Sequence, residues 1–279
     1  MIANYHTHTA RCNHAQGEEW EYVETAIANG LKILGFSDHS PQVYPDGYIS
    51  KIRMRPEELP QYIQTIDNLK QKYGDRIELH CGLEAEYFPA LFEKLMELLE
   101  QYPGVEYLIL GQHCAANEYD VENPNRWYTW DWEQGNEYKL ASYVEQVVEG
   151  MHTGKFLYLA HPDVCLYSGD PAIYRKHMRQ LCQEAKRCGL PLEINAQGVR
   201  RKDIQNSYPL PAFWQIAAEE GCTAVFGCDA HQPQFTGDAE YPVEQTLLDE
   251  GYDPSATVLK VGHHGSASST SYRFLNEVM

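Results

Sequence analysis

The feature that most constrains the fold of this chain is a regular alternation of short apolar runs with longer amphipathic stretches. The apolar runs are rich in aliphatic and aromatic residues, which is typical of β-strands. The longer stretches repeat apolar residues at helical spacing, for example at Leu59, Ile63, Ile66 and Leu69. The predicted strands are residues 2–6, 31–37, 77–83, 106–111, 156–160, 192–195 and 223–227. The predicted helices are residues 18–29, 56–73, 92–99, 137–152, 171–188 and 211–221.

Strands that alternate with helices in this way indicate βα units and a parallel sheet. Seven strands separated by helices in a chain of 279 residues predict an α/β fold of one closed or nearly closed barrel. The longest irregular segment is 114–135, which is acidic and rich in Tyr and Trp. A segment of that length within a domain is typical of a substrate loop or lid.

Composition excludes several classes of protein. Hydrophobic residues make up 43% of the chain, which excludes a disordered protein. No run of about 18 apolar residues and no signal peptide is visible, so we expect a soluble cytoplasmic protein without membrane contact. The 22 basic and 40 acidic residues give a net charge of −18, which disfavours nucleic acid as a partner. The eight cysteines are irregularly spaced, and we expect reduced thiols.

Potential metal ligands stand at or just after the ends of six of the seven predicted strands. A single His-x-His pair or a lone histidine is more often a structural residue, but this coincidence at six ends is hard to obtain by chance. The carboxyl ends of barrel strands meet at one face, so these side chains are expected to converge. The set comprises seven imidazoles and two carboxylates: His6, His8, His14, His39, Glu84, His113, His161, Asp229 and His231.

Imidazole and carboxylate together suit Zn²⁺, Fe or Mn²⁺. Nine ligands are too many for one ion but suit two or three ions with a bridging carboxylate. Sites of several metals serve phosphoryl transfer, because they hold both the attacking and the leaving oxygen. Arg200 and Arg201 follow the sixth strand and are natural partners of a phosphate. The sequence therefore favours a small phosphate-containing substrate.

Eight short motifs resemble the polymerase-and-histidinol-phosphatase (PHP) superfamily: HTH, CNHA, FSDHSP, GLEAEY, GQH, AHPD, EINAQGVR and CDAH. The order of FSDHSP and MRPEELPQYIQTIDNLKQKYGDRIELHCGLEAEYFP is similar to the histidinol-phosphatase branch, and the resemblance covers about residues 1–235. It implies a distorted (β/α)7 TIM-like barrel with three divalent transition metals. In the implied grouping, His6, His8, Glu84 and Asp229 hold one ion, and Glu84, His113 and His161 hold a second. His14, His39 and His231 hold the third.

The resemblance also implies an activity, the hydrolysis of L-histidinol phosphate to L-histidinol and phosphate by a metal-bridging hydroxide. Glu84, Asp229, His231 and Arg200 are the predicted catalytic residues. Arg200 and Arg201 are expected to bind the phosphate, and Glu118, Tyr119 and Asp120 the cationic end of the substrate. Two alternatives stay open: a phosphoesterase for a nucleotide or sugar phosphate, and a metal-binding module without catalysis. The oligomeric state is also open.

The tail, residues 236–279, departs from this pattern. TGDAE and VLKVGHHGSASSTSYRFL are similar to the end of a metallo-β-lactamase-like domain of DNA-uptake channel proteins. Asp238 and His263 would be ligands there, but the HxHxDH motif of such a site is missing, so neither they nor His264 count as functional. We predict a helix at 242–251, a strand at 256–261 and a helix at 270–278, which either complete the barrel or mark a chimera of two domains, 1–235 and 236–279.

Overall fold

The computed structural model describes residues 2–120, 122–123, 126–129, 135–200, 208–237 and 258–259. Two runs of parallel strands form the sheet. One has the order β1 (Ala3–Asn4), β2 (Ile33–His39), β3 (Glu78–Ala85) and β4 (Tyr107–Leu110). The other has the order β7 (Leu192–Asn195), β8 (Thr223–Gly227) and β9 (Val258–Leu259).

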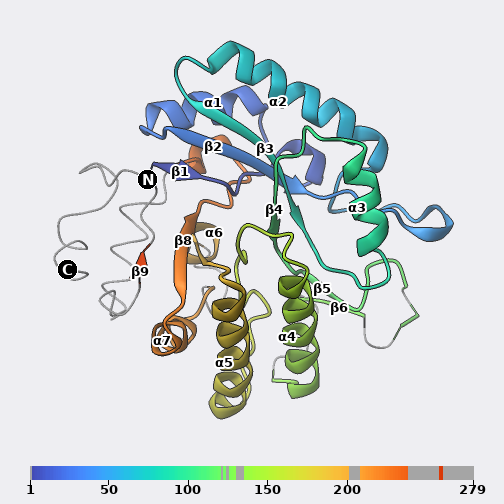
Figure 1. Cartoon of the computed structure of the whole chain (residues 1–279), viewed down its shortest axis with the longest axis vertical. Coiled ribbons are helices and arrows are strands. Elements are labelled where there is room, and N and C mark those ends of the chain that lie inside the picture. The colour runs from blue at the N-terminus through green and yellow to red at the C-terminus, as the bar shows by residue number, and fades with distance from the viewer. Residues whose placement is uncertain are drawn as a thin grey trace.

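Isolated bridges join the two runs of strands into one curled sheet. Leu159 pairs in parallel with Leu110 at the end of β4 and with Leu192 at the start of β7. At the far edges Thr7 pairs with Ala230, where the His8 amide donates to the Ala230 carbonyl at 3.0 Å. The carboxyl ends of β1 and β8 are therefore held together, and the strands form one curled sheet (Figure 1). We call the side on which the carboxyl ends of the strands gather the mouth of the sheet. This confirms the predicted α/β fold of a distorted barrel.

Helices surround the curled sheet (Figure 1). In the view of Figure 1, α1 and α2 lie over β2 and β3, while α5 contacts both α4 and α7. The α-helices are α1 (Glu19–Ala28), α2 (Leu59–Tyr73), α3 (Phe92–Glu100), α4 (Glu137–His152), α5 (Pro171–Cys188), α6 (Ala196–Arg200) and α7 (Pro211–Glu220). Short 3₁₀ turns are η1 (Ala10–Cys12), η2 (Pro45–Gly47), η3 (Pro56–Glu58) and η4 (Pro233–Phe235).

Local chemistry explains the ends and buried faces of these helices. Asp170 caps α5 by accepting from the Ala172 amide at 2.8 Å, and Pro171 suits the first turn because its missing N–H needs no partner there. On α2 the buried stripe includes Tyr62, whereas Ile63 is only partly buried. The Tyr62 hydroxyl donates to the Gly82 carbonyl in β3 at 2.9 Å, which fixes the rotation of α2 on the sheet.

Six of the seven predicted strands are confirmed with small shifts of their bounds. The predicted strand 156–160 is instead extended backbone with a bridge at Leu159 alone. It still occupies the place of a strand, because the Leu157 and Ala160 amides donate to β4 at 2.7 and 2.8 Å. Segment 114–135, predicted as irregular, contains a short antiparallel pair, β5 (Cys114–Ala115) and β6 (Trp127–Tyr128). All eight cysteines are free thiols, as expected.

In the tail, β9 falls inside the predicted strand 256–261 and pairs in parallel with Thr223 and Ala224 of β8. The predicted helices 242–251 and 270–278 lie outside the described residues, as do Arg201, Asp238, His263 and His264. The resemblance of the tail to a metallo-β-lactamase-like domain falls mainly on residues outside the described ones. Among the helices that the structure describes, none has the length and apolar character to cross a membrane.

Candidate metal centre

The structure brings all nine predicted metal ligands together at the mouth of the curled sheet. Eight of them end or follow a strand or extended segment, and His14 follows the turn η1, so the parallel arrangement brings most of these side chains to one place. Overlapping groups of three lie with their ligand atoms within 4.8 Å of one another: His6, Glu84 and His161; His6, His8 and Asp229; His8, His39 and Glu84; and His14, His39 and His231. His113 completes the set, with its Nε2 3.7 Å from Glu84 Oε1.

Glu84 lies at the centre of this cluster. Its Oε1 is 2.7 Å from His161 Nε2 and 3.6 Å from His6 Nε2. Its Oε2 is 3.0 Å from His39 Nδ1 and 3.4 Å from His8 Nε2. The two oxygens thus face different sets of histidines, which is the arrangement that a bridging carboxylate requires. A glycine at 111 is needed for it, because a Cβ there would lie 1.8 Å from Glu84 Oε1.

Asp229 presents the second carboxylate from just beyond β8. Its Oδ1 lies 3.3 Å from His8 Nε2, 3.6 Å from His6 Nε2 and 3.3 Å from His231 Nδ1. The Asp229 backbone has a φ of 46°, in the left-handed region that most residues avoid. His161 likewise has a positive φ of 27°. Such backbone strain tends to gather at functional sites, where the surrounding structure holds it.

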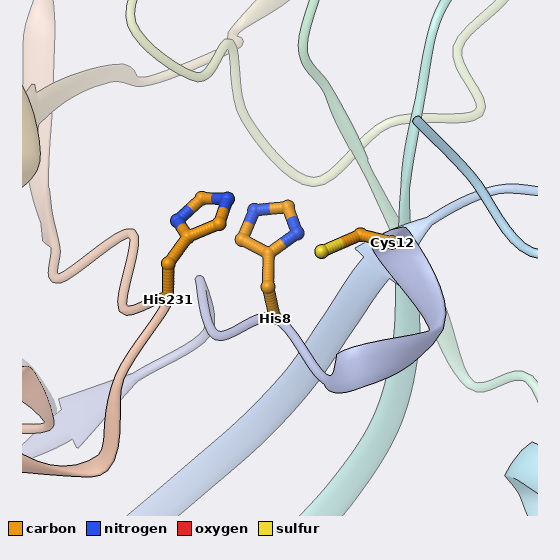
Figure 2. Close-up of side chains that lie close together, drawn as sticks. All are labelled: His8, Cys12 and His231. Atoms are coloured by element: carbon orange, nitrogen blue, oxygen red, sulfur yellow. The ribbon is translucent and has the colours of Figure 1, made fainter. Parts of the chain in front are cut away.

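The third group of histidines lies toward the outer rim. His231 Nε2 is 3.0 Å from His14 Nε2, and the His14 Nδ1 is 2.7 Å from the Cys12 carbonyl. The ring of His231 stacks on that of His8 with 4.1 Å between centroids. Figure 2 shows His8 between His231 and the thiol of Cys12. These three residues also offer ligand atoms within 4.8 Å of one another, so Cys12 is a further potential donor beside the nine.

Both carboxylates are ionised in this surrounding. Burial alone would raise the pKa of Glu84, but the histidines around it, including His6 and the hydrogen-bonded His161, outweigh burial and hold that pKa well below the usual range. Burial is likewise outweighed at Asp229, chiefly by His6, and its pKa is also lowered well below the usual range. Two negative charges therefore sit at the bottom of the cluster, where they would attract cations.

The histidines divide into two kinds. Burial opposes protonation of His6, but the neighbouring carboxylates, Glu193 foremost, outweigh it and raise its pKa to about 10. Burial and the charge of His231 lower the pKa of His14 to about 4. Burial lowers the pKa of His113 to about 3. His14 and His113 are thus neutral at pH 7, and a neutral imidazole is the form that binds a metal.

Orphaned polar atoms test whether the donor set fits metal ions. Within the described residues, Glu84 Oε2 and Asp229 Oδ1 are buried and accept no hydrogen bond. A buried acceptor without a partner costs about 1–3 kcal/mol, and more when it is charged. Both atoms face imidazole nitrogens at 3.0–3.4 Å, as ligand atoms around a shared ion would. The residues present therefore fit divalent metals.

A cavity of about 630 Å³ opens over the cluster. Arg200 lines it, with its guanidinium 4.6 Å from the centroid of the Phe235 ring and its NH2 donating to the Cys228 carbonyl at 3.0 Å. A positive group beside the candidate metal ligands is suited to a phosphate. The remaining lining residues are His8, His14, His39, Lys51, Ile52, His113, Thr129, His161, Val164, Leu166, Gln197, Tyr208, Asp229, His231, Gln232 and Phe235.

The structure does not bring Glu118, Tyr119 or Asp120 to this cavity. Glu118 is fully buried and forms an ion pair with Arg53, whose Nε donates to Glu118 Oε2 at 2.8 Å. A buried guanidinium needs such a counter-charge. Glu118 is therefore buried against Arg53 and is not exposed to a substrate. Tyr119 packs against the small apolar cluster around Phe88.

Sequence reasoning missed several buried polar residues that surround the candidate ligands: Asp38, Glu86, Glu193 and Asn195. Asp38 Oδ1 lies 3.6 Å from His8 Nδ1, and Glu86 Oε1 accepts from the His113 amide at 2.6 Å. The available signal was period-two spacing, because Glu86 stands two residues after Glu84 on the same extended segment.

Comparisons with known proteins agree with the resemblance found in the sequence. The PHP domain family matches residues 4–197. A probable histidinol-phosphatase of Deinococcus radiodurans is 32% identical over 240 residues, which cover 85% of this chain and 88% of that protein.

Two solved structures share the fold. A proposed histidinol phosphatase of Listeria monocytogenes has a TM-score of 0.68 at 20% identity, covering 84% of this chain and 97% of that one. A histidinol phosphate phosphatase of Lactococcus lactis, solved with zinc, L-histidinol and phosphate, has a TM-score of 0.64 at 17% identity, covering 90% and 94%.

Proposed function

The chain belongs to the PHP domain family, and on that premise we propose that it is a metal-dependent phosphomonoesterase that hydrolyses L-histidinol phosphate to L-histidinol and phosphate. One observation carries the proposal: nine imidazoles and carboxylates from distant parts of the chain meet in one cluster, and seven of them line a cavity whose wall also holds Arg200. The similar proteins add the substrate, since the Deinococcus relative is named for histidinol phosphate hydrolysis and the Lactococcus structure holds its products.

We assign the candidate ligands to three divalent transition metals, with Zn, Fe and Mn as the candidates. His6, His8, Glu84 and Asp229 would hold the first, Glu84, His113 and His161 the second, and His14, His39 and His231 the third. Glu84 faces proposed ligands of more than one ion with each oxygen, His6 and His161 with Oε1 and His8 and His39 with Oε2, which supports a bridging role. When bound, such metals supply positive charge at the phosphoryl group and lower the pKa of water.

The chain's own residues bind and orient the substrate. Arg200 at the cavity wall would pair with phosphate oxygens and offset charge that builds on them during the reaction. Glu84 and Asp229 supply the negative charge that attracts the metal ions to the cluster. The leaving alkoxide needs a proton, and the candidate donors are a water molecule and His231, which lines the cavity and could donate only from a nitrogen that does not hold metal.

We propose that residues 1–235 carry the activity and that 236–279 supply an additional strand, as the pairing of β9 with β8 supports. The tail's resemblance to a metallo-β-lactamase-like domain stays a prediction. A biosynthetic phosphatase also fits the cytoplasmic location expected from the sequence.

A phosphate-release assay tests the function directly. Purified protein grown with added metal should release phosphate from L-histidinol phosphate faster than from nucleotide and sugar phosphates, and a chelator should abolish the release. Activity confined to a nucleotide or sugar phosphate would move the assignment to the other phosphoesterase hypothesis. Retained metal without release from any substrate would favour the module that binds metal without catalysis.

A further inference from the structure

Glu193 is a fully buried carboxylate directly behind the candidate metal ligands. It lies on β7, which has the extended segment around Leu159 on one side and β8 on the other. Its Oε1 is 2.7 Å from His6 Nδ1. Its Oε2 accepts from the His161 amide and from Asn195 Nδ2, each at 2.9 Å. Both oxygens are therefore engaged, and each is engaged by donors alone.

The contact with His6 selects one form of that imidazole. A carboxylate oxygen can only accept, so when His6 gives up a proton to bind metal, the ring keeps its remaining proton on Nδ1 and donates it to Glu193. The lone pair then lies on Nε2, which is the atom that faces Glu84 and Asp229 at 3.6 Å. A carboxylate behind a histidine ligand holds its tautomer and ring orientation and increases its basicity.

The second oxygen reaches two other candidate ligands. It holds the backbone of His161 through the amide, at a residue whose φ is positive. It also holds Asn195, whose Nδ2 donates in turn to Asp229 Oδ2 at 3.0 Å. One side chain thus connects His6, His161 and Asp229, which come from three separate parts of the chain.

The neighbouring strand leaves room for this carboxylate. A Cβ at Gly227 in β8 would lie 1.7 Å from Glu193 Oε1, so any larger residue there would displace it. The absence of a side chain at 227 is thereby explained by Glu193.

We propose that Glu193 is a positioning residue of the metal centre, which fixes the ligating tautomer of His6 and couples it to His161 and Asp229. The inference rests on the proposed function, because it assumes that these residues hold metal. A carboxylate is required at 193 because both of its ends must accept. A glutamine has one accepting oxygen and one donating NH2 group. Its NH2 group would face either the Nδ1–H of His6 or the two donors from His161 and Asn195, and the hydrogen bonds on that side would be lost.

The test is the variant Glu193→Gln, loaded with Co²⁺ as a spectroscopic probe. We expect its affinity for Co²⁺, measured by chelator competition, to fall about 10- to 100-fold and its visible absorption spectrum to change. The matched control is Asp163→Asn. Asp163 is equally buried and accepts from Tyr174 and the Leu210 amide, and among the described residues it forms no hydrogen bond or ion pair with an imidazole. This control should lose stability while its cobalt spectrum and affinity stay those of wild type.

Wild-type affinity and spectrum in folded Glu193→Gln would overturn the inference. If that variant does not fold, Gly227→Ala displaces the same carboxylate without removing its charge, and it must show the loss of affinity; wild-type affinity there would also overturn the inference. Wild-type protein that binds Co²⁺ yet hydrolyses no phosphate ester would contradict the proposed function alone. Wild-type protein that binds no metal would overturn both.

Discussion

At the scale of single residues, the proposed metal site depends on how many histidines face the carboxylate of Glu84. Glu84 faces His6 and His161 with one oxygen and His8 and His39 with the other. His14, in contrast, lies at the rim and belongs to one group only. Removal of these two side chains should therefore have unequal consequences for metal content.

We predict that Glu84→Ala loses two metal positions together, because both proposed ions share this carboxylate. His14→Ala serves as the matched control and should lose one. Elemental analysis of ions per chain, after growth with added metal, measures both. Loss of a single ion from Glu84→Ala would show that Glu84 does not bridge.

Arg200 gives a second prediction at this scale. Arg200→Ala should raise the inhibition constant of inorganic phosphate about 10- to 100-fold, the range expected for hydrogen bonds to a charged group, and should leave the metal content unchanged. Arg175→Ala is the control, because Arg175 pairs with Glu219 on the exposed surface. Phosphate inhibition equal to that of wild type would reject a phosphate-binding role for Arg200.

At the scale of elements, period and spacing predicted the strands whose ends carry the site. The bounds of β7 and β8 agree with the predicted 192–195 and 223–227. Segment 156–160 has the composition of a strand but pairs regularly at Leu159 alone, since its partners β4 and β7 each contact it over a short length. Such pairing depends on distant segments, which local periodicity does not encode.

The ligand set was predictable because it stands at strand ends, whereas the polar residues that support it were not. Whether Glu118 meets substrate or Arg53 depends on which loop lies beside it, and those residues are 65 positions apart. The role of Glu193 likewise requires knowing that β7 lies opposite His6, 187 residues earlier. Contacts between such distant segments follow from the closed sheet and not from any single motif.

Arg53 joins two loops at the mouth, and this gives a prediction about pH. Its guanidinium contacts Glu118 and Glu86, while Tyr44 and Ser50 donate to Glu118. Burial would raise the pKa of Glu118, but Arg53 outweighs it and lowers that pKa below its usual value. The stabilisation is therefore present above the unfolded-state pKa, about 4.3, and is lost as pH falls through the lower folded-state value.

Glu118→Gln should accordingly destabilise the protein by about 3 kcal/mol at pH 7, because it leaves Arg53 short of a buried counter-charge. The loss relative to wild type should shrink once the pH falls below about 4. Urea unfolding at several pH values measures this difference. A loss that is constant across the whole range would contradict the ion pair as its source.

At the scale of the whole molecule, the metal centre is also a structural link. The candidate ligands come from segments that begin at His6 and end at His231, so ions held there would join the segments that follow β1 and β8 in the curled sheet. The direct backbone link between those edges is the bridge of Thr7 with Ala230. Two carboxylates and several imidazoles lie close together beside this bridge. Without bound metal ions, Glu84 Oε2 and Asp229 Oδ1 are buried without a hydrogen-bond partner, which destabilises the closed sheet.

Metal removal should therefore lower the melting temperature. An ion at 1,000 times its dissociation constant stabilises the native state by about 4 kcal/mol, which for a chain of this size is a rise of roughly 10 °C. Calorimetry with chelator and then with restored Zn²⁺ measures the shift, and Glu84→Ala should show a much smaller one, since it has lost two of the positions. If the melting temperature of the wild type did not respond to Zn²⁺, the ligands would not join the two edges of the sheet through shared ions. An equal response in Glu84→Ala would place the stabilising ion away from Glu84, at the rim histidines.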